Sequence, residues 1–147
     1  DAAESPPIPK YVQEWFSPFG PEAEDYPLQA MGHHYARRSH STHDNIDWLE
    51  EAFPQRVFMN PVDAEARGIA DGDDVHVFNQ FGEMIIPVRV NVRIMPGLVD
   101  IPQGGWYTPD SNGIDRRGAI NVLTTHRNTP YAFGNPQHTI MVQVEKA

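Results

Sequence analysis

The strongest constraint on the fold is a pair of apolar segments separated by a tight turn. Residues 75–79 and 84–92 flank Gln80-Phe-Gly-Glu, which is typical of a β-hairpin. In the second segment alternate residues are aliphatic and are expected to face one side of a sheet, namely Ile86, Val88, Val90 and Val92. Pro87 donates no backbone hydrogen bond, which favours an edge strand. The chain is therefore expected to build its core from β-sheet.

Four further strands are expected from short apolar segments. They lie at residues 27–31, 57–59, 98–101 and 139–144. Residues 120–125 fit either a helical turn or a strand, and the sequence leaves this open. The predicted fold class is mainly β with small helices, arranged as a barrel.

Two short helices are predicted from their starting residues. Asn60 followed by Pro61 predicts a capped helix that ends at Gly68. Asp44 or Asn45 is expected to cap a second helix that runs to about residue 52.

Length and composition indicate one acidic domain without cysteine chemistry. The 147 residues include no cysteine, which excludes disulfides and thiolate metal sites. The formal net charge of −9 argues against nucleic acid as a partner, and no apolar run approaches the roughly 20 residues of a membrane-spanning helix.

Residues 1–25, rich in proline and acids, are expected to be an extended linker before a barrel domain over residues 26–147. Because the chain begins with Asp1 rather than methionine, we expect a piece of a longer protein.

The most unusual polar stretch is residues 32–45, which we call the histidine loop. It holds four of the seven histidines, the pair Arg37 and Arg38, and three hydroxyl side chains. No acid occurs between Tyr26 and His43. Guanidinium, hydroxyl and imidazole groups are donors suited to phosphate oxygens. The composition therefore predicts an anion-binding loop.

Two alternatives compete with anion binding. A zinc site would draw on His33, His34, His40 and His43. No cysteine or glutamate assists them and no HExxH pattern is present, so no metal ligand is expected. A solvated loop without a ligand stays open. Neither Ser39 nor Ser41 has the GxSxG context of a nucleophile, and no catalytic residue is expected.

A second acid-free segment runs from residue 116 to residue 144 and is rich in donors, including Arg117, Asn121 and Asn135. The two acid-poor segments are expected to line one anionic ligand. Between them, Gln103-Gly-Gly-Trp forms a turn with two possible roles. It either places Trp106 in the core or lets the glycine backbone approach a flat ring.

Several motifs follow one another in an order known from one protein family. They are Tyr26-Pro-Leu-Gln, the histidine loop, Asn60-Pro-Val-Asp-Ala-Glu-Ala-Arg-Gly, Pro102-Gln-Gly-Gly-Trp-Tyr, Ile120-Asn-Val-Leu-Thr and Gly134-Asn-Pro-Gln-His-Thr. Over about residues 26–146 the chain resembles the C-terminal molybdopterin-dinucleotide-binding domain of the dimethyl sulfoxide reductase family. The resemblance implies a double-psi β-barrel.

The resemblance also implies a cofactor and the residues that bind it. The cofactor is bis(molybdopterin guanine dinucleotide), with its molybdenum held by other domains of the parent enzyme and no cofactor retained by this piece alone. In the family, the loop matching residues 32–42 and the asparagine matching Asn121 line the dinucleotide, and the turn matching residues 103–106 lies near the pterin. The expected cofactor-binding residues are Gly32, His33, His34, Arg37, Arg38, His40, Ser41, Thr42, Gln103, Trp106, Asn121 and Asn135.

For the parent protein, the resemblance implies a two-electron reduction of S-oxides or N-oxides. The implied partners are the preceding domains of the catalytic chain, an iron–sulfur subunit and a membrane-anchor subunit, on the periplasmic side of the membrane. The serine that usually binds the metal would lie in an earlier domain, so this piece alone is not expected to be catalytic. A non-catalytic barrel that binds a partner or a nucleotide is the alternative.

One position departs from the family pattern. Relatives commonly have Ala-Lys-Gly-Asn-Pro where this chain has Ala132-Phe-Gly-Asn-Pro. Phe133 therefore replaces a lysine expected near the phosphates of the cofactor.

Overall fold

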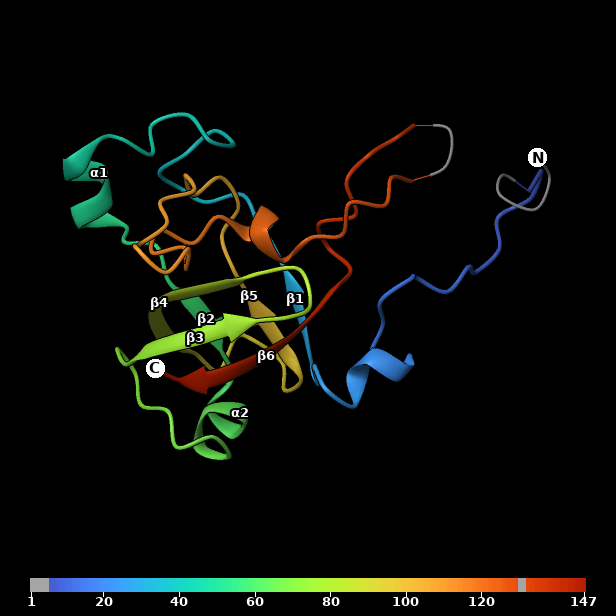
Figure 1. Cartoon of the computed structure of the whole chain (residues 1–147), viewed down its shortest axis with the longest axis horizontal. Coiled ribbons are helices and arrows are strands. Elements are labelled where there is room, and N and C mark those ends of the chain that lie inside the picture. The colour runs from blue at the N-terminus through green and yellow to red at the C-terminus, as the bar shows by residue number, and fades with distance from the viewer. Residues whose placement is uncertain (1–5, 130–131) are drawn as a thin grey trace.

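A closed β-barrel forms the body of the protein, and an extended N-terminal segment projects from it (Figure 1). The computed structural model describes residues 6–129 and 132–147. Around the barrel the strand order is β1-β5-β2-β4-β3-β6. The strands are β1 Leu28–Met31, β2 Val57–Met59, β3 Asp74–Phe78, β4 Glu83–Val90, β5 Leu98–Asp100 and β6 Ile140–Lys146. Every predicted strand is present, and the mainly β fold class is confirmed.

Two crossover connections interlock in the barrel wall. β1 pairs in parallel with β5, and β2 pairs in parallel with β4. The chain from β1 to β2 passes the position of β5, and the chain from β4 to β5 passes the position of β2. This closed six-stranded arrangement agrees with the double-psi barrel implied by the resemblance.

The parallel pairing of β1 with β5 places two long connections at one end of the barrel. Met31 lies opposite Asp100, at the ends of these adjacent strands. The connection after β1 covers residues 32–56 and the connection after β5 covers residues 101–139. Since parallel strands point the same way, both connections begin side by side. They contain the two acid-poor segments of the sequence.

The predicted alternation of the hairpin builds much of the core. Met84, Ile86 and Val88 of β4 are buried, and so are Val75 and Val77 of β3. Val75 lies opposite Ile86, and Val77 lies opposite Met84. Burial of aliphatic side chains of this size contributes roughly 1.5–3 kcal/mol each to folding, before the entropic cost.

Two details of the hairpin prediction are wrong. Val92 lies outside β4 and is 80% exposed, because Asn91 turns the chain and its side-chain oxygen accepts a hydrogen bond from the backbone N–H of Arg93. Pro87 is not on an edge strand, since β4 is paired on both sides. Pairing with β2 begins only at Val88, so the missing N–H of Pro87 falls just before that ladder starts.

The predicted helix after Asn60 is confirmed. α2 spans Pro61–Glu65, and the Asn60 side-chain oxygen accepts a hydrogen bond from the backbone N–H of Val62. Gly68 follows the helix with a φ of 65°, a left-handed conformation suited to glycine at the end of a helix.

The two remaining short helical segments, α1 and η2, test the predicted helix cap at Asp44 or Asn45 and the open assignment of residues 120–125. α1 spans Asp47–Ala52, and its N-cap is Ile46 without a side-chain cap, so the prediction of a cap by Asp44 or Asn45 is wrong. Residues 120–125 include the 3₁₀ helix η2 Ile120–Leu123, which decides against a strand.

The N-terminal segment has no regular secondary structure before the 3₁₀ helix η1 Pro21–Ala23. The Phe16 ring packs edge-on against Phe81 at the hairpin turn, with centroids 5.5 Å apart. The guanidinium of Arg127 lies 4.1 Å from the ring centroid of Trp15. Within the described ranges, none of the helices combines the length and the apolar character that crossing a membrane requires.

Replacing Asn60 with alanine is expected to lower the free energy of unfolding by about 1–2 kcal/mol. The variant loses the cap and also the hydrogen bond that the Asn60 side chain donates to the Ile94 carbonyl. Chemical denaturation would measure the change, with Asn112→Ala as the control because Asn112 is exposed. Equal stability of the two variants would show that the cap is dispensable.

Candidate functional site

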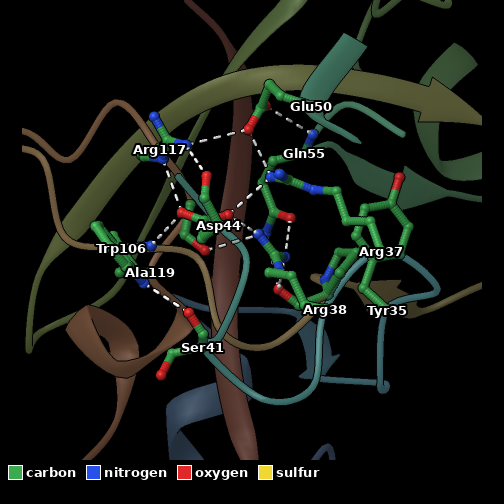
Figure 2. A network of polar contacts seen from close by, with 12 residues as sticks. Tyr35, Arg37, Arg38, Ser41, Asp44, Glu50, Gln55, Trp106, Arg117 and Ala119 are labelled. Carbon is green, nitrogen blue, oxygen red and sulfur yellow. Dashed lines mark hydrogen bonds and ion pairs between the residues drawn. The ribbon is translucent and has the colours of Figure 1, made fainter. Parts of the chain in front are cut away.

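A buried ion cluster anchors the histidine loop from beneath (Figure 2). One carboxylate, that of Asp44, receives three guanidinium groups. Arg37 Nη2 lies 2.8 Å from Asp44 Oδ1, Arg38 Nη1 contacts the same oxygen, and Arg117 Nε lies 2.7 Å from Asp44 Oδ2. The side chains of Asp44, Arg37 and Arg38 are all fully buried. The cluster therefore lies inside the protein, under the loop surface.

A second carboxylate and an amide extend the cluster. Glu50 Oε2 lies 2.6 Å from Arg37 Nη2 and 3.3 Å from Arg117 Nη2. Arg38 also donates to the side-chain oxygen of Gln55. Gln55 in turn donates to the carbonyls of Pro102 and Gly118, at 2.8 and 3.1 Å. These bonds tie the connection after β1 to the connection after β5.

Asp44 stays ionised in this environment. Burial raises the pKa of its carboxyl, but hydrogen bonds from Arg117, the backbone N–H of Trp106 and Arg38 outweigh burial. The pKa of Asp44 therefore lies below its ordinary value. A buried carboxylate with several charge-assisted donors is the situation in which the charged form is retained.

The cluster changes the role of the two arginines that the sequence offered as phosphate ligands. Arg37 and Arg38 are not free donors at the loop surface, because their guanidinium groups are buried against Asp44. A direct phosphate contact by either group would require the cluster to open. The acid that follows the acid-free stretch thus pairs with both arginines within it.

Above the cluster, the two acid-poor segments meet at a cavity of about 210 Å³. None of its lining residues is acidic, and they come from four parts of the chain: His40, Ser41, Gln103, Gly104, Ala119, Ile120, Asn121 and Gln137. This placement brings together four of the predicted cofactor-binding residues. A donor-rich cavity without carboxylates fits an anionic ligand that accepts hydrogen bonds.

Amide side chains connect across the cavity. Gln137 donates to Gln103 at 2.8 Å, and the Gln103 amide nitrogen lies 3.4 Å from His40 Nδ1. Asn135 donates to Asn121 at 3.5 Å. Gln137 was not among the predicted site residues, although it lies in the Gly134-Asn-Pro-Gln motif that carried the resemblance.

The Gln103–Trp106 turn packs against the histidine loop. Gly104 has a φ of 91°, and a Cβ at this position would lie 1.8 Å from the carbonyl oxygen of His40. Trp106 is 46% exposed, so its proposed place in the core is wrong. Its indole N–H donates to the Ser41 carbonyl at 2.7 Å, and its backbone N–H donates to Asp44 Oδ2 at 3.0 Å. The glycine allows a close approach to the loop backbone.

The remaining predicted residues lie around this centre. His34 packs edge-on against His40, with ring centroids 5.0 Å apart, and Thr42 donates back to the Ser39 carbonyl. Gly32 is buried under the cavity floor, where a Cβ would meet Ile120 at 3.0 Å. Nδ1 of His33 lies 2.6 Å from Oδ2 of Asp100.

The described part of the chain contains no group of three or more His, Asp or Glu side chains that could hold a metal ion. A larger cavity of about 540 Å³ adjoins the first through Ala119 and Asn121. Its wall includes Phe81, Tyr107 and His126. Asn121 therefore stands between two hollows on the same face of the protein.

The fold and the site define a class of protein: a barrel module with a donor-rich, acid-free cavity between the long connections at one end. The family described as "Molydopterin dinucleotide binding domain" matches residues 28–141. This chain belongs to that family.

Several sequence relatives are reductases by name. The chain is 50% identical over 140 residues to "Dimethyl sulfoxide reductase DmsA" of Haemophilus influenzae, covering 95% of this chain and 17% of that protein. It is 49% identical to the protein of the same name in Escherichia coli, with the same coverage. It is 36% identical to "Dimethyl sulfoxide/trimethylamine N-oxide reductase" of Cereibacter sphaeroides, covering 90% of this chain and 17% of that protein. The chain thus spans about a sixth of the length of these relatives.

A solved structure confirms the fold independently. Acetylene hydratase from Pelobacter acetylenicus superposes with a TM-score of 0.81 at 17% identity. The match covers 96% of this chain and 21% of that one.

Replacing Gly104 with alanine is expected to disrupt the contact between the turn and the histidine loop. The new methyl group would collide with the His40 carbonyl. Gly113→Ala is the matched control, because Gly113 has a similar φ of 86° but nothing lies within 4 Å of an added Cβ. Backbone strain of about 1–2 kcal/mol is common to both variants. Thermal unfolding should therefore show a clearly larger loss for Gly104→Ala, and equal losses would contradict the packing described.

The stabilising effect of Asp44 is expected to depend on pH. Because the pKa of Asp44 is lower in the folded protein, its contribution is fully present above the unfolded pKa of about 3.9. It should be lost as the pH falls further, through the folded pKa. Denaturation curves from pH 6 to pH 2 would measure this loss, and Asp44→Asn should remove part of the acid dependence. An unchanged acid dependence in the variant would argue against the ion cluster.

Proposed function

We propose that this domain holds molybdopterin guanine dinucleotide within a larger molybdenum oxidoreductase. The observation that carries the proposal is the acid-free cavity in which His40, Ser41, Gln103 and Asn121 converge. These residues lie within the span that matches the dinucleotide-binding family. Their hydrogen-bond donors suit the phosphate, ribose and pterin oxygens of such a ligand.

The cavity is sized for a part of the cofactor. At about 210 Å³ it accommodates a phosphate–sugar portion, and the adjoining cavity behind Asn121 extends the surface. Other domains of the parent chain would complete the enclosure. Within this domain His40, Ser41, Gln103, Asn121 and Gln137 would hold and orient the ligand and limit its contact with water.

When bound, the cofactor supplies molybdenum redox chemistry, and this chain supplies binding groups. We infer that the parent protein reduces S-oxides or N-oxides by two electrons, as the names of the relatives suggest. Preceding domains of the same catalytic chain, an iron–sulfur subunit and a membrane-anchor subunit are the proposed partners. A bis(molybdopterin guanine dinucleotide) form and a periplasmic location belong to the same proposal.

Asn121→Ala and Gln137→Ala in the full-length parent protein are expected to lower cofactor content. Each variant removes a neutral hydrogen-bonding group worth about 0.5–1.5 kcal/mol, or roughly two- to tenfold in retention. Guanine nucleotide and molybdenum per purified chain would be measured, with circular dichroism as the test of folding. Asn112→Ala is the control, since Asn112 is exposed and lines neither cavity. Normal cofactor content in both variants would mean that Asn121 and Gln137 are solvated surface residues that do not bind the cofactor. The proposal would then lose its basis.

Phe133→Lys tests the departure from the family pattern. Phe133 is 75% exposed and has a φ of 50°, so a lysine would meet no steric obstacle beyond the backbone strain already present. Cofactor content is expected to stay unchanged or to rise, because the variant restores a cation. A fall in content would show that the aromatic ring itself contributes to binding.

A further inference from the structure

We propose that Asp44 is the positioning residue of the dinucleotide site. Its buried carboxylate fixes the histidine loop and the 103–106 turn in the relative placement that forms the cavity. The inference rests on the proposed function, because the cavity matters to the cofactor only if it binds the cofactor. The arginines of the loop then have an internal role, and the residues that line the cavity contact the ligand.

The two oxygens of Asp44 serve different segments of the chain. Oδ1 receives Arg37 and Arg38, which both belong to the histidine loop. Oδ2 receives the backbone N–H of Trp106 at 3.0 Å and Arg117 Nε at 2.7 Å, which both belong to the connection after β5. One carboxylate therefore joins the histidine loop to the connection after β5 (Figure 2).

The joined segments include the lining residues themselves. Ser41 lies three positions before Asp44, and its carbonyl accepts the indole N–H of Trp106. The carbonyl of His40 lies against Gly104, with no space for a side chain between them. A shift of either segment at Asp44 would therefore move His40 and Ser41 relative to Gln103. Asp44 is fully buried and does not line the cavity, so its effect on the ligand must pass through these segments.

Charge balance makes this carboxylate hard to replace. Three guanidinium groups face the two carboxylates of Asp44 and Glu50, which leaves one excess positive charge. Several guanidinium nitrogens are already buried without a hydrogen-bond partner in the described structure, namely Nε and Nη1 of Arg37 and Nε of Arg38. Breaking a buried ion pair from one side leaves an uncompensated charge, which is strongly destabilising.

The test compares Asp44→Asn with two other variants in the full-length parent protein. Asp71→Asn is the matched control, because Asp71 forms an ion pair of 2.8 Å with Arg89 that is largely exposed and remote from the cavity lining. The double variant Asp44→Asn with Arg117→Gln tests rescue, since it returns the cluster to one excess positive charge. Arg117 is chosen because its side chain is 33% exposed and its replacement is the least disruptive.

Two measurements separate positioning from general stability. Hydrogen exchange on cofactor-free protein reports the order of residues 37–45 and 103–106 against the barrel strands. The guanine nucleotide retained per chain after gel filtration measures how well the site holds the cofactor. Asp44→Asn is expected to lower the hydrogen-exchange protection of both segments together by at least about tenfold, while the protection of the barrel strands stays unchanged. Nucleotide retention is expected to fall by a similar factor. The double variant should recover both, and Asp71→Asn should change neither.

The inference is overturned if Asp44→Asn leaves protection of both segments unchanged, or if it loosens them while retention stays normal. If the single variant does not accumulate as folded protein, the double variant decides: recovery of folded, cofactor-retaining protein supports the inference, and failure to recover overturns it. The proposed function fails separately, when Asn121→Ala and Gln137→Ala both retain the nucleotide normally. Loss of retention in those two variants with normal retention in Asp44→Asn would leave the function standing and reject only the positioning role.

Discussion

The site depends on one buried carboxylate shared by three guanidinium groups. Transferring an ion into a protein interior costs several kcal/mol, so a cluster of this kind persists only when its charges are paired and hydrogen-bonded. Asp44 meets that condition with donors from two distant parts of the chain. The result is a polar loop whose anchors are ionic rather than apolar. A loop with few aliphatic residues can then hold a fixed shape beside the barrel.

The barrel topology determines which segments Asp44 can join. β1 and β5 are parallel neighbours, so the connections that follow them start at the same end of the barrel. The first supplies Arg37, Arg38 and Asp44, and the second supplies Trp106 and Arg117. A simple up-and-down barrel joins consecutive strands by short turns and would not bring two long connections together in this way. The interlocked crossovers are thus the structural reason that a site can form between segments more than sixty residues apart.

The sequence predicts those features that depend on a few adjacent residues. The strands follow from local apolar patterns, and α2 follows from Asn60 and Pro61 because cap and helix start are neighbours. The sequence also predicts that the two acid-poor segments meet, because both lack carboxylates and both are therefore expected to line one anionic ligand. Asp44 was misassigned as a cap because a cap is the local role of an aspartate before a helix, worth about 1 kcal/mol. Its actual partners include Arg117, 73 positions away, and no local pattern reports such a pairing. Pro87 was misplaced for a similar reason, because closure of the barrel is a property of all six strands.

On the proposed function, the cluster also gives a physical reason why Phe133 can replace a lysine. A lysine at this exposed position would act through solvent, where charges are screened over about 8 Å at physiological ionic strength. The excess positive charge of the cluster lies beneath the histidine loop, where the side chains of Arg37 and Arg38 are fully buried and that of Arg117 is 33% exposed, and burial weakens such screening. It therefore favours an anion in the cavity without touching it, while His40, Ser41 and the amides provide the directional contacts. Charge and geometry are supplied by different residues in this arrangement, so the loss of one surface cation removes neither the attraction nor the hydrogen bonds that orient the ligand.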